Sequence, residues 1–227
     1  MKKGIDAPLV PIIFAACGLV GLIPAWASHH WYNFIFPLLM LVLALTYVHT
    51  SCSGKYTIIR ETVDSLPLPR TSRVLDLGTG HGAVLLEVAK KLRQPGKVVG
   101  IDLWQAADQS GNSLAATEQN IAAAGVGAVA TVKTADMTKL PFDSASFDYV
   151  FASLAIHNVK PRGRRELALR EALRVLKPAG YLIIIDLEHV GEYERYLRGR
   201  CQEVSVKRTG INGLWGWLPT RVLIAKK

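Results

Sequence analysis

Cysteine is scarce in this chain of 227 residues: its three cysteines, Cys17, Cys52 and Cys201, lie far apart and lack the spacing of a metal site. We therefore expect three reduced thiols in a reducing compartment and no bound metal. The sequence also has no internal repeat and no low-complexity tract. The phosphate-binding pattern Gly-x-x-x-x-Gly-Lys-Ser/Thr is missing as well, which excludes a nucleotide site of that kind.

Charge is absent from most of the first 54 residues. No charged side chain occurs in residues 7–28, and the apolar run 8–27 is about 20 residues long, enough to cross a bilayer as a helix. A second apolar run of about 18 residues, 31–48, follows a short polar turn. The two runs predict a membrane-spanning helical hairpin over residues 1–54, in which Gly18 and Gly21 let the helices pack closely.

Two other interpretations of the apolar runs stay open. Residues 25–27, Ala-Trp-Ala, resemble a signal-peptidase site after a basic start. However, the run is long for a signal peptide, and a second run follows at once. Alternatively, the hairpin lies in the membrane plane or packs on the rest of the protein, although neither run has the charged face of an interfacial helix.

Basic residues flank the predicted hairpin on both sides. Lys2 and Lys3 precede it, Lys55 and Arg60 follow it, and the connecting turn has no Lys or Arg. The positive-inside tendency therefore predicts an integral membrane protein with both ends of the hairpin in the cytoplasm. The domain that follows the hairpin is then expected on the cytoplasmic side.

The remaining chain, residues 55–227, carries a net charge of +8, because Lys2, Lys3 and Asp6 together contribute +1 of the total of +9. A basic domain tethered to a bilayer is drawn to anionic lipid headgroups, so the lipid bilayer is its expected partner. Nucleic acid is the other usual partner for such charge. The sequence has no nucleic-acid-binding motif, and we expect no nucleic acid to bind.

Apolar strands and helices alternate along residues 55–227. Strands are predicted over residues 73–77, 97–101, 128–134, 147–153, 181–187, 202–207 and 220–225. Helices are predicted over residues 55–66, 83–92, 112–124, 162–176 and 190–197. This order predicts an α/β fold with a Rossmann-like, doubly wound, mostly parallel seven-stranded sheet. Ligands of such sheets bind at the carboxyl ends of the strands.

Residues 74–82 read Val-Leu-Asp-Leu-Gly-Thr-Gly-His-Gly. The apolar start is typical of a buried strand, and Gly78, Gly80 and Gly82 supply a tight turn where the backbone approaches a ligand closely. Asp76 lies in the strand end, where an unpaired carboxylate is costly, so the turn favours a ligand with a cationic or polyhydroxyl group. The rival interpretation is a dinucleotide site, because Asp102 follows at about the distance that such a site requires.

The glycine turn resembles the first motif of the class I S-adenosylmethionine (SAM)-dependent methyltransferases, Asp-x-Gly-x-Gly-x-Gly. Residues 140–143, Leu-Pro-Phe-Asp, and residues 174–181 before the predicted fifth strand also match that family's pattern. Ala179 departs from it, since the family usually has glycine there. Together the matches run from about residue 74 to residue 187, and they favour a methyltransferase over a dehydrogenase.

The resemblance implies SAM as the cofactor, with its ammonium group at Asp76, its ribose at Asp102 and its adenine amine at Asp136. Met137 would pack against the adenine ring, which suits a soft apolar side chain. Asp136 is alternatively a helix cap, and Trp104 either covers the nucleoside or packs in the core. The cofactor-binding residues predicted in this way are Asp76, Gly78, Thr79, Gly80, Gly82, Asp102, Leu103, Trp104, Asp136, Met137 and Ser153.

The sequence says less about the methyl acceptor than about the cofactor. The predicted fourth strand ends Ser-Leu-Ala-Ile-His at residues 153–157, without the Asn/Asp-Pro-Pro-Tyr/Phe motif of enzymes that methylate planar amines. This end resembles the branch that includes the ubiquinone and menaquinone methylators. His157 is the candidate catalytic base, because an imidazole accepts protons near physiological pH. Alternatively, it positions the substrate or caps the next helix.

Together these patterns predict a membrane-anchored methyltransferase that acts on a small lipophilic acceptor: a quinone, an isoprenoid phenol or a lipid headgroup. Two alternatives remain. One is a methyltransferase that acts on a membrane protein, and the other is a non-catalytic SAM-binding scaffold in the membrane.

Overall fold

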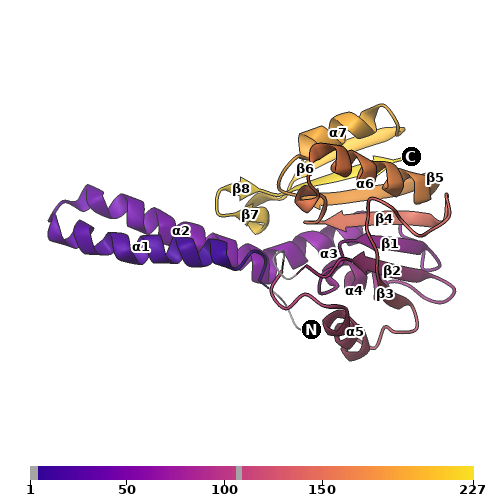
Figure 1. Cartoon of the computed structure of the whole chain (residues 1–227), viewed down its shortest axis with the longest axis horizontal. Coiled ribbons are helices and arrows are strands. Elements are labelled where there is room, and N and C mark those ends of the chain that lie inside the picture. The colour runs from indigo at the N-terminus through magenta and orange to yellow at the C-terminus, as the bar shows by residue number, and fades with distance from the viewer. Residues whose placement is uncertain (1–4, 106–108) are drawn as a thin grey trace.

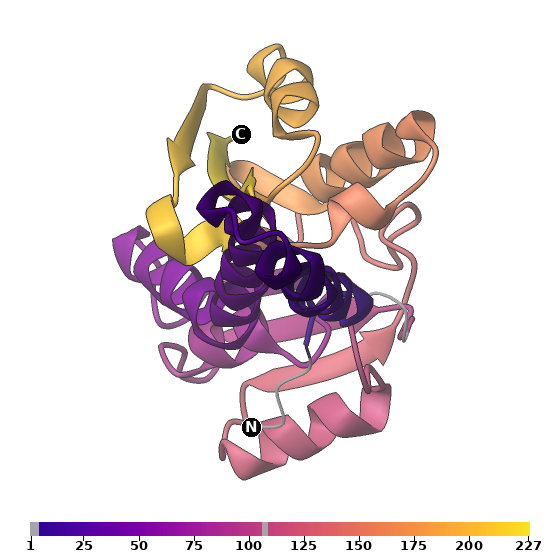
Figure 2. The same ribbon diagram turned by 90° about the vertical axis from the view of Figure 1, so that its left-hand side faces the viewer.

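The computed structural model describes residues 5–105 and 109–227. Figure 1 shows a helical hairpin that projects from an α/β domain, and Figure 2 views the molecule from the side of the hairpin. Lys2 and Lys3, on which the expected membrane orientation partly depends, lie outside the described residues.

The hairpin consists of α1 (Leu9–Ala27), a short 3₁₀ turn η1 (Trp31–Phe34) and α2 (Ile35–His49). One stretch of π-helix, η2 (Thr50–Gly54), joins α2 directly to α3 (Lys55–Ser65). The boundary expected between residues 54 and 55 therefore falls inside a continuous helical segment. Since α3 packs into a core of the α/β domain, the hairpin and the domain share this segment.

The two hairpin helices pack closely along small residues, as the sequence predicted. A Cβ atom at Gly18 would lie 2.7 Å from Cγ of Leu41, and one at Gly21 would lie 3.2 Å from Cβ of Pro37. Both glycines therefore face α2 and allow the close approach of its backbone.

In the part of the chain that the structure describes, two segments are long and apolar enough to cross a membrane. They are Leu9–Ala27, with a mean hydropathy of 2.2, and Trp31–Ser65, with 1.8 in its most apolar window. Only 17% and 28% of these windows are buried in the protein, unlike the helices of a soluble core. A signal sequence near the N-terminus meets the same criterion, so length and composition alone do not establish a span.

The main sheet confirms the predicted Rossmann-like fold. Its strands are β1 (Arg73–Leu77), β2 (Lys97–Asp102), β3 (Ala130–Thr134), β4 (Phe147–Ser153), β5 (Leu176–Asp186), β6 (Glu203–Arg208) and β9 (Arg221–Lys226). They lie in the order β3-β2-β1-β4-β5-β9-β6. The first five are parallel, and β9 pairs antiparallel with β5 and β6. The smaller elements near the C-terminus are η4 (Gly210–Gly213), β7 (Leu214–Trp215) and β8 (Leu218–Pro219).

Helices cover both faces of this sheet, which explains why its central strands are apolar on both sides. One face is covered by α3, α4 (Ala83–Ala89) and α5 (Leu114–Ala123). The other is covered by α6 (Arg162–Val175) and α7 (Val190–Arg198). Alternate residues of β1 enter the two cores and fix the strand between the helical layers.

The chain passes from α6 into β5 earlier than the sequence predicted. The helix ends at Val175 and the strand begins at Leu176, whereas a turn over residues 178–180 was expected before the strand. Within that stretch Ala179 has φ +60°, and its N–H donates to the carbonyl oxygen of Lys227 at 3.0 Å. This left-handed conformation favours glycine, which gives a physical reason for the glycine that the resembling family usually has here.

The small sheet of β7 and β8 packs against the base of the helical hairpin. The rings of Tyr47 and Trp215 lie 5.0 Å apart, and those of Phe14 and Trp217 lie 5.4 Å apart. These aromatic contacts fix the hairpin to the last part of the domain.

Gly54 lies so close to η4 that a Cβ atom there would be 2.0 Å from the carbonyl oxygen of Asn212. We predict that Gly54→Ala lowers the free energy of unfolding by about 1–3 kcal/mol, the usual cost of overpacking. Gly163→Ala in α6 is the matched control, because its Cβ would meet no atom within 4 Å. The control should be neutral or stabilising by up to about 1 kcal/mol. Denaturant unfolding in detergent measures both, and equal effects would contradict this account of the joint.

Candidate active site

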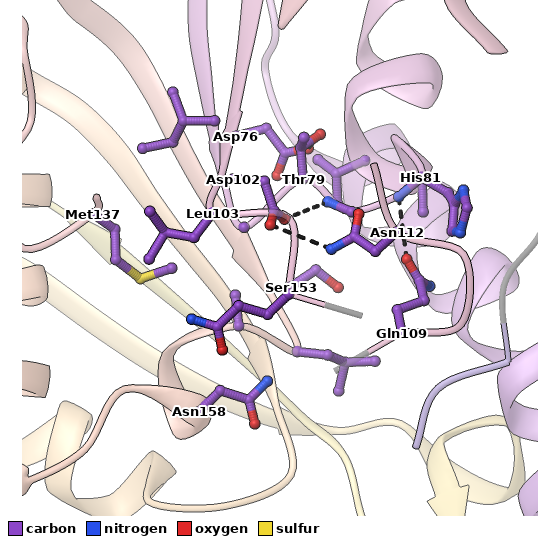
Figure 3. Close-up of a pocket in the computed structure, with 18 of the residues that line it drawn as sticks. Asp76, Thr79, His81, Asp102, Leu103, Gln109, Asn112, Met137, Ser153 and Asn158 are labelled. Atoms are coloured by element: carbon purple, nitrogen blue, oxygen red, sulfur yellow. Dashed lines mark hydrogen bonds between the residues drawn. The ribbon is translucent and has the colours of Figure 1, made fainter. Parts of the chain in front are cut away.

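A cavity of about 240 Å³ opens at the carboxyl ends of the central strands (Figure 3). It lies where β1 has β2 on one side and β4 on the other, which is the point where the strand order reverses. Of the cofactor-binding residues predicted from the sequence, those that line this cavity are Asp76, Gly78, Thr79, Gly80, Asp102, Leu103, Asp136, Met137 and Ser153.

The glycine turn leaves β1 through conformations that glycine tolerates, with φ of +67° at Gly78, +49° at Gly80 and +86° at Gly82. The N–H groups of Gly78 and Thr79 donate to the carbonyl oxygen of Ile101 at 2.9 and 3.0 Å, so the turn is fixed to the end of β2. Gly82 lies outside the cavity lining. It precedes the first residue of α4 and ends the turn.

Asp76 is buried at the end of β1 and keeps one carboxylate oxygen without a partner. Its Oδ2 accepts hydrogen bonds from Oγ1 of Thr79 at 2.6 Å and the N–H of Leu85 at 3.2 Å. Its Oδ1 has no hydrogen-bond partner among the described residues. Burial, with a smaller effect of the nearby Asp102 charge, raises the pKa of Asp76 to about 7 despite these two bonds. An ammonium group in the cavity would pair with Oδ1 and stabilise the charged form.

Asp102 ends β2 with both carboxylate oxygens facing donors. Its Oδ2 accepts the N–H of Gly80 at 2.8 Å, while Oδ1 accepts from the N–H of Trp104 at 2.6 Å and Nδ2 of Asn112 at 3.3 Å. In Figure 3, dashed lines connect the Asp102 carboxylate to the glycine turn and to Asn112. Oδ2 can accept a further bond, so the carboxylate suits a hydroxyl of a ribose.

Trp104 does not line the cavity. Its indole Nε1–H donates to Oγ1 of Thr134 at the end of β3, at 2.7 Å, which directs the ring to the neighbouring strand. The preceding Leu103 lines the cavity and is half exposed. At this position the apolar side chain that faces the cavity is therefore Leu103 and not Trp104.

Asp136 follows β3 and takes part in two kinds of contact. Its Oδ1 accepts the N–H and the hydroxyl of Thr138, both at 2.8 Å, which is the capping role left open by the sequence. Its Oδ2 pairs with Nη2 of Arg164 at 2.8 Å. Partial burial opposes the charge, but the bonds from Thr138 and the Arg164 guanidinium together hold the pKa of Asp136 below its usual value. Met137 lines the cavity beside it, where a flat ring would pack.

His157 lies beside the cavity and not in its lining. It belongs to the 3₁₀ turn η3 (Ile156–Asn158), and its Nδ1 lies 2.6 Å from Oδ1 of Asp186, which is fully buried. The main-chain N–H of His157 also donates to Oδ2 of Asp186 at 3.2 Å. Asp186 thus fixes the orientation of the imidazole, and a catalytic role of His157 stays a prediction.

Helix α3 contributes Lys55, Tyr56 and Ile59 to the cavity lining. The lining residues that sequence reasoning missed are Asp6, Gln109, Asn112, Asn158, Lys160 and Arg164. The only signal for the first of these was that Asp6 is the one acidic residue in the first 60. An acid at the edge of an apolar segment indicates a partner elsewhere in the fold, but the pattern does not identify that partner.

A family model described as "Methyltransferase domain" matches residues 75–184 of the chain. The ubiquinone/menaquinone biosynthesis C-methyltransferase UbiE of Geotalea daltonii is 31% identical over 127 residues, which cover 56% of this chain and 50% of that protein. The sterol 4-C-methyltransferase strm-1 of Caenorhabditis elegans is 28% identical over 132 residues, or 58% and 36% of the two chains. The chain therefore spans half or less of the length of these relatives.

Solved structures share the fold of the domain. A SAM-dependent methyltransferase from Aquifex aeolicus superimposes with a TM-score of 0.59 at 21% identity, over 74% of this chain and 88% of that one. The [4+2]-cyclase SpnF gives a TM-score of 0.62 at 18% identity, over 76% and 81%. Such likeness shows the fold alone, since one fold hosts different reactions.

The raised pKa of Asp76 predicts how cofactor binding depends on pH. Below about pH 7 the free carboxyl is protonated and does not attract an ammonium group, so binding must release this proton. We predict that the association constant of S-adenosylhomocysteine rises about tenfold per pH unit up to about pH 7 and then levels off. Calorimetry from pH 5.5 to 8.5 measures this association constant. In the control variant Asp76→Asn, binding of S-adenosylhomocysteine should be weak and should not depend on pH. A flat wild-type profile would contradict the assignment.

Proposed function

Residues 75–184 match the methyltransferase domain model, and from this premise we propose that the protein is a SAM-dependent methyltransferase that methylates a small lipophilic acceptor at a membrane. The acceptor class comprises quinones, isoprenoid phenols and lipid headgroups. The names of two relatives support it, since one refers to ubiquinone and menaquinone biosynthesis and the other to a sterol.

The observation that carries this proposal is the position of the cavity at the base of the hairpin. Lys55, Tyr56 and Ile59 line it, and they belong to the helical segment that continues α2. At a helical rise of about 1.5 Å per residue, Lys55 lies only about 10 Å along the helix from Val48, where the apolar run ends. An acceptor that partitions into a bilayer around the hairpin would therefore be close to the cavity.

We propose that the hairpin spans the bilayer with both ends in the cytoplasm. The low burial of its apolar windows supports a lipid environment, and its length matches a hydrocarbon core of about 30 Å. A cytoplasmic domain has access to SAM, and its net charge of +8 over residues 55–227 favours anionic headgroups.

Bound SAM supplies a methyl group on a positively charged sulfur, which leaves as a neutral thioether. The chain's own residues bind and orient the reactants: Asp76 would hold the ammonium group, Asp102 the ribose, and Asp136 with Met137 the adenine. Ser153 and Ala155, at and just beyond the end of β4, line the cavity next to the glycine turn. An acceptor held beside these residues, in line with the methyl group, would react faster because the two reacting atoms are already aligned.

An acceptor hydroxyl or acidic carbon must also lose a proton, and we propose His157 for this step. Its contact with the buried Asp186 is the arrangement that orients a base and stabilises its protonated form. His157→Asn is predicted to lower kcat by about 100-fold or more. The affinity for S-adenosylhomocysteine should stay nearly constant, because His157 does not line the cavity.

His189→Asn is the matched control for this variant. His189 follows β5, and its imidazole nitrogens lie 3.8 and 3.9 Å from carboxylate oxygens of Glu188 and Glu192. It should retain wild-type kcat in steady-state assays. If His157→Asn weakened S-adenosylhomocysteine binding as much as it lowered kcat, its role would be structural and not that of a base.

Tritium transfer tests the acceptor class directly. Membranes that contain the protein are incubated with SAM labelled in its methyl group and then extracted with organic solvent. We predict label in the lipid extract, and its loss in an Asp102→Asn variant. Label confined to the protein fraction would instead indicate a methyltransferase of membrane proteins. No transfer by material that binds S-adenosylhomocysteine would indicate a scaffold.

A further inference from the structure

Two charged residues at the ends of the hairpin reach the cavity. Asp6 precedes α1, and Lys55 is the first residue of α3. Both line the cavity, and Nζ of Lys55 lies 2.5 Å from Oδ2 of Asp6. Lys55 is only 5% exposed. Burying such a pair costs desolvation energy that pairing alone often does not recover. A contribution to stability therefore does not by itself explain why this pair is present.

A chain of hydrogen bonds connects this pair to the glycine turn. Nε2 of Gln109 donates to Oδ1 of Asp6 at 2.9 Å, and Oε1 of Gln109 accepts the N–H of His81 at 3.1 Å. Ser51 of the hairpin donates to Oδ2 of Asp6 at 2.8 Å. Figure 3 shows Gln109 beside His81. Because the turn begins two residues after Asp76, the ion pair lies at the end of the cavity where the ammonium group of SAM is placed.

We infer that Lys55 binds the carboxylate of the methionine end of SAM and that Asp6 positions Lys55 for this. The inference rests on the proposed function in taking SAM as the ligand. That end of SAM carries one ammonium group and one carboxylate, and Asp76 already provides for the first. Among the described residues, the Lys55 ammonium donates to the carboxylate of Asp6. An ammonium has three donors, so a second carboxylate fits.

The other cations of the cavity lining are less suited to this role. Lys160 is exposed. Arg164 is also exposed, and it pairs with Asp136 beyond the end of β3, at the adenine end of the site. Lys55 is the cation that combines burial with a hydrogen-bonded connection to the glycine turn.

This assignment makes the hairpin a part of the cofactor site. Asp6 and Lys55 flank the hairpin on either side in the sequence, so one bound carboxylate would stabilise the joint between the anchor and the domain. Removing residues 1–54 as an anchor would also remove Asp6 and leave Lys55 as a buried charge without its partner.

Ligand selectivity tests the inference with the full-length protein in detergent. S-adenosylhomocysteine is compared with its decarboxylated form, which keeps the ammonium group and lacks the carboxylate. We predict that Lys55→Gln weakens S-adenosylhomocysteine binding by about 10- to 100-fold, as expected for a buried charged hydrogen bond, and the decarboxylated ligand by less than about threefold. Calorimetry measures both dissociation constants. Lys91→Gln, which breaks an exposed pair with Asp64 outside the cavity, is the control with no change in either.

The double variant Asp6→Asn with Lys55→Gln separates binding from folding, because it removes both buried charges together. It should fold and still fail to prefer S-adenosylhomocysteine over the decarboxylated ligand. If the double variant regained the wild-type preference, Lys55 would serve only to neutralise Asp6 and the inference would be wrong. If neither ligand bound the wild-type protein, the proposed function itself would fail.

Discussion

A buried carboxylate is costly when one of its oxygens lacks a partner, and among the described residues Oδ1 of Asp76 is such an oxygen at the centre of the site. Thr79 and Leu85 engage its Oδ2 and fix its orientation. The glycine turn that follows brings main-chain N–H groups against β2 and leaves the space above the strand open. A cationic ligand relieves the cost of burial, whereas a phosphate would add to it. The choice of a sulfonium cofactor over a dinucleotide therefore depends on this one unpaired oxygen.

The hairpin is connected directly to the domain that carries this site, although its apolar sequence indicated a separate anchor. Its second helix runs through η2 into α3 without interruption, and α3 contributes to a domain core. Aromatic contacts from β7 and β8 support its base, and Asp6 connects it to the loop after β2 through Gln109. In the proposed membrane-anchored state, this joint would fix the distance between the bilayer and the cavity.

Much of the fold could be predicted from the sequence because its signals are local. Buried apolar strands bounded by glycine, proline or acids gave β1 and β4 with their observed bounds, and the acids at strand ends gave Asp76, Asp102 and Asp136 as neighbours at one edge of the sheet. The early start of β5 was missed because Pro178 and Gly180 favour a turn, whereas both lie within β5 in the structure, with Ala179 between them at φ +60°.

The rest of the site depends on contacts between distant parts of the chain. The Asp6–Gln109 bond spans 103 residues, and no periodicity or motif specifies it. Likewise, the sequence could not show that the Trp104 ring would bond to Thr134 or that His157 would face Asp186. Such side-chain directions are decided by packing between elements, which a single sequence determines only through the complete fold.

Calorimetric titration of the intact, detergent-solubilised protein with S-adenosylhomocysteine, in competition with NADH, tests the central claim most directly. The account predicts one molecule of S-adenosylhomocysteine bound per chain at neutral pH, with no displacement by NADH. Binding of NADH, or the absence of any uptake of S-adenosylhomocysteine by folded protein, would contradict it.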